Sequence, residues 1–172
     1  MNLKKFVLNS LLLGIGALLH QITPSLVLGM KPDFSLVMLF IVILFNSKNF
    51  KICIISGLVV GIFSALTTGF PGGQIANIID KLVTTIVIFL FIRLIGRRVK
   101  EQILMIGVLF VGTLISGLVF LFFASIIAGL PLSFFALVVS IVMPATLLNT
   151  IVGVILYKAI RTSMKLNPYS FL

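Results

Sequence analysis

The sequence has few charged residues and almost no cysteine, and both shortages exclude whole classes of protein. Charged residues make up 9% of the 172 residues, whereas a soluble domain has about 25%. Hydrophobic residues make up 60%, and the mean hydropathy is +1.34. Such a chain cannot cover a water-facing surface, which excludes a soluble enzyme, a secreted disulfide scaffold and a disordered tail. The single cysteine, Cys53, excludes an internal disulfide, and no metal site is expected there because no other thiol or histidine lies nearby.

Sequence motifs of catalysis are missing as well. The chain contains no Walker A, HExxH or GxSxG pattern. One histidine and three acidic residues leave little for general acid–base catalysis. We therefore expect no enzyme activity and no cofactor.

Long uncharged stretches predict an all-α integral membrane protein with six transmembrane helices. A spanning helix needs about 20 mostly apolar residues, and glycine- and proline-containing segments at 69–74 and 129–133 divide the longer stretches. The expected helices are 5–25, 33–47, 51–68, 77–95, 102–128 and 133–160, in one transmembrane domain of residues 1–172. The second helix is short, so it is expected either to be buried among its neighbours or not to cross the membrane fully.

The positive charges favour one orientation in the bilayer. With the N-terminus inside, 11 of the 13 Lys and Arg residues fall on cytoplasmic segments, and only Lys31 and Lys81 lie in the outer half. This separation needs an even number of spans, so both termini are expected in the cytoplasm. The net charge of +10 therefore indicates a multi-pass protein of the cell membrane, surrounded by lipid, and no nucleic-acid partner.

Two aspartates interrupt the apolar outer half, and each has a lysine beside it: Lys31 with Asp33, and Asp80 with Lys81. A charge in a membrane helix costs about 2.5–3.5 kcal/mol and usually faces a cavity or another charge, which favours a ligand site. The alternative is helix capping by Asp33, or by Asn77 with Asp80, and capping and binding can coexist. Lys81, close to an expected helix N-terminus, needs a compensating anion, either Asp33 or a bound one.

Other polar residues of the outer half leave two interpretations open. The glycine-rich segment 67–74 is either an ordinary turn between helices or a turn that lets the backbone approach a ligand. His20 makes either a structural hydrogen bond or a contact with a ligand or proton. Asn149, beyond the Pro144 kink, makes either an interhelical hydrogen bond or a contact with a ligand.

Several segments resemble the TrpP-type tryptophan transporter family of Gram-positive bacteria. They are GMKPD at 29–33, SALTTGFPGGQIANIIDK at 64–81 and LNT at 148–150, together with the start of the chain at 11–20. The middle segment is long and specific, and the resemblance extends from about residue 3 to 160. It implies tryptophan as the substrate, which the residues alone do not identify.

The family is similar in turn to the substrate-binding S components of energy-coupling-factor (ECF) transporters. This similarity implies six helices, cytoplasmic termini and a binding site near the outer face. It also implies that small residues of the first helix, here Ser10 and Gly14, dock a separate ECF transmembrane module driven by two ATPases.

Tryptophan would need partners for its ammonium, its carboxylate and its indole N–H, and apolar walls for its ring. We favour Lys81 for the carboxylate and Asp33 for the ammonium, with Phe70 as the aromatic residue nearest the motif. Three side-chain amides, those of Gln74, Asn77 and Asn149, remain possible acceptors for the indole N–H. The expected substrate-binding residues are Lys31, Asp33, Gln74, Asn77, Asp80, Lys81 and Asn149.

Two other functions remain as alternatives. One is a solitary ion-coupled amino-acid symporter, which the scarcity of acidic residues near the middle of the membrane argues against. The other is a non-transporting membrane scaffold like the rod-shape protein MreD, which would not need the outer lysines and aspartates.

Overall fold

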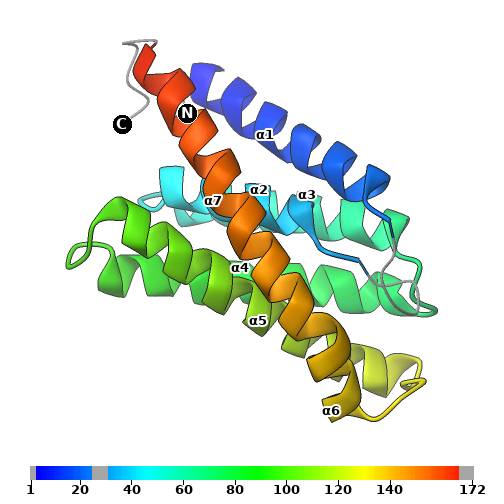
Figure 1. Ribbon diagram of the computed structural model, residues 1–172. Helices are drawn as coiled ribbons and strands as arrows, with labels where there is room; N and C mark the ends of the chain where they lie inside the picture. The colour runs from blue at the N-terminus through cyan, green and yellow to red at the C-terminus, as the bar shows by residue number, and fades with distance from the viewer. Residues whose placement is uncertain (1–2, 25–30, 167–172) are drawn as a thin grey trace.

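A computed structural model describes residues 3–24 and 31–166, and within these ranges the chain is helical without strands. Residues Gly29 and Met30 of the GMKPD segment lie outside the described residues. Helices α6, η1 and α7 continue one another as a single long helix, whose middle part, η1, is a π-helix (Figure 1). The elements are α1 (Leu3–Ile22), α2 (Phe34–Phe45), α3 (Phe50–Thr67), α4 (Gly73–Ile95), α5 (Glu101–Ile127), α6 (Phe134–Leu137), η1 (Val138–Val142) and α7 (Met143–Leu166).

The described helices lie within a few residues of the expected ones, except that α4 begins at Gly73 and not at 77, and that α7 ends at Leu166 and not at 160. Helices α1, α3 and α5 and the continuous helix Phe134–Met164 are each long and apolar enough to cross a membrane. Helix α4 begins at Gly73, four residues before the expected start at 77, because Gly72 turns the chain with a φ of 71°. This left-handed conformation suits glycine, which has no Cβ to clash with the backbone.

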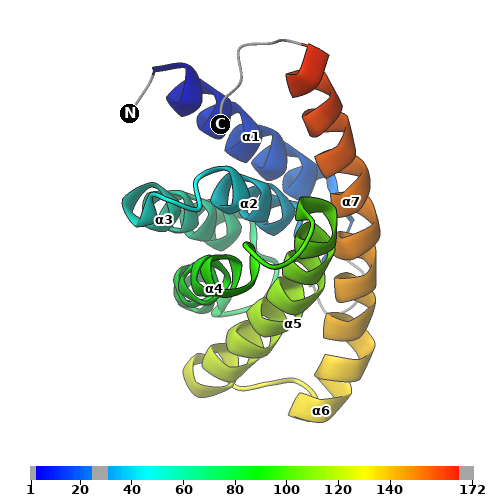
Figure 2. The same ribbon diagram turned by 90° about the vertical axis from the view of Figure 1, so that its left-hand side faces the viewer.

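The helices are joined so that the two ends of the bundle differ (Figures 1 and 2). One end holds the first turn of α1, the last turn of α7 and the α2–α3 and α4–α5 connections; we call it the termini end. The opposite end holds the last turn of α1 and the α3–α4 and α5–α6 connections; we call it the cavity end. Both ends of the described chain therefore lie at the same end of the bundle.

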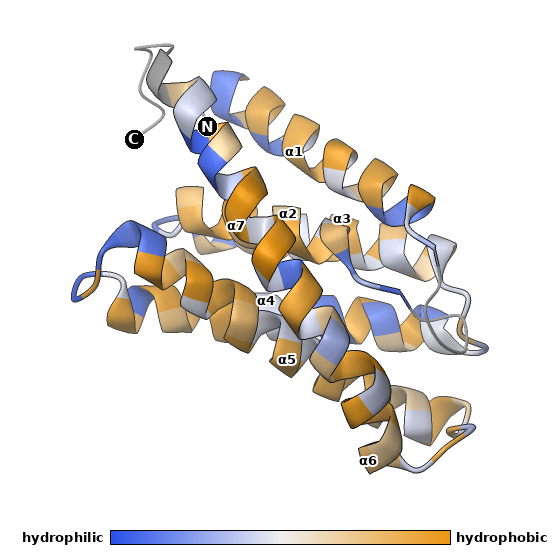
Figure 3. Ribbon diagram, in the orientation of Figure 1, coloured by the Kyte–Doolittle hydropathy of each residue, from blue (hydrophilic) through white to orange (hydrophobic). Residues whose placement is uncertain are grey.

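Helix α2 is the centre of the bundle. It contacts α1, α3, α4, α5 and α7 (Figure 2), and each of its residues from 35 to 43 is buried. Of the two expectations for this short helix, burial among its neighbours is therefore the one that the structure shows. None of the large apolar side chains found exposed belongs to α2; they belong mainly to the longer helices around it, which are predominantly hydrophobic along their length (Figure 3).

At the termini end, an ion pair joins α5 to α7. Glu101 accepts a hydrogen bond from the guanidinium of Arg161, which also lies 6.0 Å from the ring centroid of Phe45. Glu101, the acidic residue other than Asp33 and Asp80, is therefore paired at the end of the bundle opposite to them.

Candidate functional site

A cavity of about 100 Å³ lies between the helices toward the cavity end. Its lining comes from the end of α1, the start of α2, the end of α3 with the following turn, and from α4, α5, η1 and α7. A buried water needs about 10–15 Å³ of such space, so the cavity has room for a small organic molecule. No element forms this site alone, because each contributes only one part of the lining.

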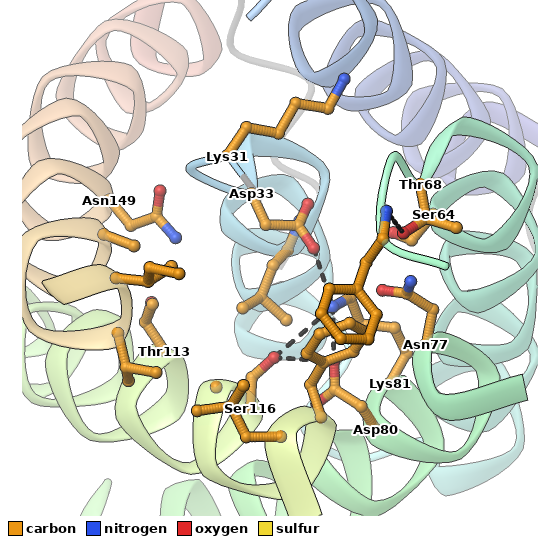
Figure 4. A pocket seen from close by; sticks show the side chains of 18 of the residues that line it. Lys31, Asp33, Ser64, Thr68, Asn77, Asp80, Lys81, Thr113, Ser116 and Asn149 are labelled. Carbon is orange, nitrogen blue, oxygen red and sulfur yellow. Dashed lines mark hydrogen bonds and ion pairs between the residues drawn. The ribbon is translucent and has the colours of Figure 1, made fainter. Parts of the chain in front are cut away.

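One side of the cavity is a buried ionic cluster, which we define as Asp33, Asp80 and Lys81 (Figure 4). The ammonium Nζ of Lys81 lies 2.7 Å from Oδ2 of Asp33 and 2.6 Å from Oδ2 of Asp80. Asp80 also accepts hydrogen bonds from the hydroxyls of Thr84, at 3.0 Å, and Ser116, at 2.9 Å. The cluster therefore ties α2, α4 and α5 together, with two carboxylates to one ammonium.

Asp33 both caps a helix and takes part in the ionic cluster. Its Oδ1 accepts the backbone N–H of Leu36 at 3.1 Å and the hydroxyl of Ser35, which are cap interactions of α2. The same oxygen lies 3.3 Å from Nδ1 of His20 on α1. Its other oxygen, Oδ2, faces the ammonium of Lys81, which favours the charged form of the carboxyl group. Asp33 is therefore a partly buried carboxyl group shared by a helix cap, a lysine and a histidine.

The expectation that Asn77 and Asp80 cap α4 is wrong, because the helix starts at Gly73. Asn77 lies inside the helix and donates its amide N–H to the carbonyl of Gly73 at 2.9 Å. Asp80 lies further along and binds side chains instead of free backbone N–H groups. Lys81 has a compensating anion in Asp33, one of the two expected possibilities.

The opposite side of the cavity contains a buried amide without a hydrogen-bond partner. Asn149 on α7 is 0% exposed, and neither its amide nitrogen nor its amide oxygen is bonded within the described part of the protein. The hydroxyl of Thr113 on α5 is likewise buried and unpartnered. Both side chains line the cavity, across from the ionic cluster (Figure 4). The interhelical hydrogen bond considered for Asn149 is not formed.

Aromatic and aliphatic side chains complete the lining. The ring of Phe70 is folded inward from the α3–α4 turn, is 4% exposed, and packs edge-on against Phe120 of α5 with ring centroids 5.7 Å apart. Leu36, Leu121 and Val142 add apolar surface. The glycine-rich turn thus contributes a wall of the cavity, although it also connects two helices.

The structure brings together most of the expected substrate-binding residues. Those that line the cavity are Lys31, Asp33, Asn77, Asp80, Lys81 and Asn149. The side chain of Gln74 is exposed and lies outside the lining. The described residues contain no group of His, Cys, Asp and Glu able to hold a metal ion.

Sequence reasoning missed the hydroxyl residues of the cavity. Thr113 and Ser116 lie three residues apart on α5, so they share one face of that helix. Paired hydroxyls on one face of an otherwise apolar helix are the signal that could have found them.

Ser10 and Gly14, the expected docking residues, lie on α1 and are not among the residues that line the cavity. Ser10 is exposed, and a Cβ atom added at Gly14 would meet nothing within 4 Å. This part of α1 is therefore open on the outside of the bundle.

Comparison with known proteins gives one consistent result. The family described as "Tryptophan transporter TrpP" matches residues 2–165. A protein of Clostridium acetobutylicum is 52% identical over 96% of both chains, and one of Clostridium perfringens is 50% identical over 95% of this chain and 94% of its own. One of Bacillus subtilis is 41% identical over 98% of this chain and 97% of its own. Each is named "Probable tryptophan transport protein". No solved structure matches the chain.

Proposed function

The chain belongs to the tryptophan transporter TrpP family, and on this premise we propose that it takes up tryptophan by binding it in the cavity described above. It is a multi-pass membrane protein of a transporter family and not an enzyme. The observation that carries the proposal is the two-sided lining of the cavity: side chains of both charges lie across from an unpartnered buried amide, and Phe70 and Phe120 add aromatic surface to the lining.

The charges of the cavity suit a free amino acid. The ionic cluster has two carboxyl groups and one ammonium, so it offers more than one oxygen that could accept the ammonium group of a ligand. Lys81 already contacts two carboxylates. Lys31 lines the cavity, is half-buried, and forms no ion pair within the described residues. We therefore assign the ligand carboxylate to Lys31 in place of Lys81, the residue that the sequence favoured.

The apolar lining suits an aromatic side chain. A binding pocket for such a group is mostly hydrophobic, with a few polar groups that fix orientation. Phe70 and Phe120 already form an edge-on pair, and an indole ring adjacent to them gains both buried area and aromatic contact, about 0.5–1.5 kcal/mol beyond area for each pair.

We place the termini end in the cytoplasm and the cavity end outside. Basic residues are concentrated at the termini end, and positive charge favours the cytoplasmic side. They include Lys4, Lys5, Lys48, Lys51, Arg93, Arg97, Arg98, Lys100, Lys158 and Arg161. In this orientation the cavity opens toward the medium from which tryptophan is captured.

We further propose that the protein is the substrate-capturing subunit of an ECF-type transporter. The chain lacks an ATP-binding motif of its own, so energy would come from a separate transmembrane module and its two ATPases. The open surface around Ser10 and Gly14 on α1 supports a docking site, since small residues let two helix backbones approach closely.

One observation favours a second candidate, a solitary ion-coupled symporter. His20 lies beside Asp33 in a buried group of titratable side chains, and such groups mark proton or ion pathways in membrane proteins. A scaffold of the MreD type has less support, because it has no use for a cavity lined with paired charges.

Binding of labelled tryptophan to the purified protein tests the assignment of the cavity. We expect wild type to bind and Asp33→Asn to lose most binding. The matched control is Glu101→Gln, which also removes one carboxylate charge, but at the opposite end of the bundle. Equal binding by both variants would refute the site, and no binding by wild type would refute the function.

Vesicles that contain only this protein separate the two modes of transport. Uptake driven by an imposed proton or sodium gradient supports the symporter. Uptake that appears only when an ECF module and its ATPases are present with ATP supports the ECF-type subunit.

A further inference from the structure

The buried polar groups without partners fall into two classes, inside and outside the cavity. Asn149 and Thr113 line it, and they are 0% and 5% exposed. Thr85 is 0% exposed and also unpartnered, but it is not part of the lining; its hydroxyl instead lies against Gly57 of α3. Asn149 and Thr113 can therefore be satisfied by something that enters the cavity. Nδ1 of His20 also lines the cavity without a hydrogen bond, but it lies 3.3 Å from Oδ1 of Asp33, on the side of the ionic cluster.

Leaving these two side chains unpaired costs free energy that a bound molecule recovers. A buried donor or acceptor without a partner costs about 1–3 kcal/mol, and Asn149 has both kinds of group unpaired. Asn149 is therefore a poor structural residue and a good recognition residue, because it offers an acceptor and two donors to a ligand in a site away from bulk water.

From this arrangement we infer that Asn149 and Thr113 form the subsite that recognises the indole N–H and so select tryptophan among aromatic amino acids. The inference rests on the proposed function. In it, the indole N–H donates to Oδ1 of Asn149, and the hydroxyl of Thr113 completes the polar surface. The amino and carboxylate groups of the ligand lie at the other side of the cavity, near Asp33 (Figure 4).

The other two side-chain amides that the sequence offered for this role are less suited to it. Gln74 is exposed and does not line the cavity. Asn77 lines it, but its amide N–H is already bonded to the carbonyl of Gly73, and it lies on the same helix as Asp80 and Lys81. An amino acid whose ammonium group sits at the ionic cluster can present its ring to the far side, where Asn149 lies.

The test compares ligands that differ in one hydrogen-bond donor. Tryptophan and 3-(3-benzothienyl)alanine have nearly the same shape, but the second carries sulfur in place of the indole N–H. We expect wild type to prefer tryptophan about tenfold or more, the ratio that corresponds to one unsatisfied buried acceptor. Asn149→Leu is expected to bind both ligands equally, and Thr113→Val is expected to reduce the preference.

Thr85→Val is the matched control, since it removes an equally buried, unpartnered hydroxyl outside the cavity. Its preference for tryptophan should equal that of wild type. Asn149→Leu and Thr113→Val replace unpaired polar groups with apolar ones and so should fold well, which thermal unfolding without ligand checks.

Three results would overturn the inference, and they differ from one another. If wild type prefers tryptophan and Asn149→Leu keeps the same preference, the subsite is wrong while the proposed function stands. If wild type binds both ligands equally, nothing in the cavity recognises the N–H. If wild type binds neither ligand, the proposed function fails and the subsite fails with it.

Discussion

Oδ2 of Asp33 lies 2.7 Å from Nζ of Lys81, so the residue that caps the central helix α2 is also the counter-ion of a lysine buried in α4. The pair joins two segments that are distant in the sequence, at the place where the cavity forms. Lys81 is 3% exposed and is held by Asp80 as well. Stability and binding are therefore expected to change together when this cluster is altered.

Lys81→Met should destabilise the protein strongly. Removal of one partner from a buried ion pair costs about 3–5 kcal/mol, because the remaining charge is left uncompensated. Two carboxylates remain here, Asp33 and Asp80, so neutralising one with Asp80→Asn should recover part of the loss. Thermal unfolding in detergent checks this. A double variant no more stable than Lys81→Met would contradict the structural account of the cluster.

Two substitutions of Asp33 should separate capping from binding. Asn is as good an N-cap as Asp, whereas Ala loses about 0.5–2 kcal/mol of helix stability. Asp33→Asn is therefore expected to unfold at a higher temperature than Asp33→Ala, while both lose tryptophan binding because the carboxylate is gone. Unfolding curves and equilibrium binding on the same preparations measure the two effects. Full binding by Asp33→Asn would show that its charge is not needed.

Sequence reasoning reached the charged part of the site but not all of its geometry. Charged residues are rare in this chain, so Asp33, Asp80 and Lys81 are easy to identify. A charge within a membrane helix is costly, which by itself indicates a functional role. The start of α4 was placed too late, because asparagine is a common N-cap and the conformation of Gly72 is not visible in the sequence. The residue type of Thr113 alone does not predict a site, since a hydroxyl in an apolar helix usually bonds its own backbone.

Close packing of α3 against α4 depends on Gly57. A Cβ atom at this position would lie 2.3 Å from the hydroxyl oxygen of Thr85 and 3.3 Å from the carbonyl of Lys81. Gly57→Ala should therefore lower the unfolding temperature, through overpacking that typically costs about 1–3 kcal/mol. Thr85→Ala in the same chain removes the obstructing hydroxyl and should restore part of the loss. Additive losses in the double variant would mean that the two residues are not in contact.

Gly14 and Gly16 on α1 provide a test of docking with an internal control. A Cβ atom at Gly16 would lie 2.8 Å from the Cβ of Met38 on α2, whereas at Gly14 it would meet nothing within 4 Å. Gly16→Leu is therefore expected to destabilise the fold. Gly14→Leu should leave both unfolding temperature and tryptophan binding as in wild type, because nothing in the described part of the chain lies within 4 Å of a Cβ atom there.

The same Gly14→Leu variant should nevertheless fail to transport tryptophan in cells if the open face of α1 receives a partner helix. Leucine fills the gap that two closely packed helix backbones need, so the partner would be held away while the binding cavity stays intact. Uptake of labelled tryptophan by cells, set against binding by the purified variant, measures the difference. Normal uptake by Gly14→Leu would remove the structural argument for docking at this face. Loss of binding together with uptake would instead indicate that the substitution reaches the cavity, because a docking defect alone leaves binding unchanged.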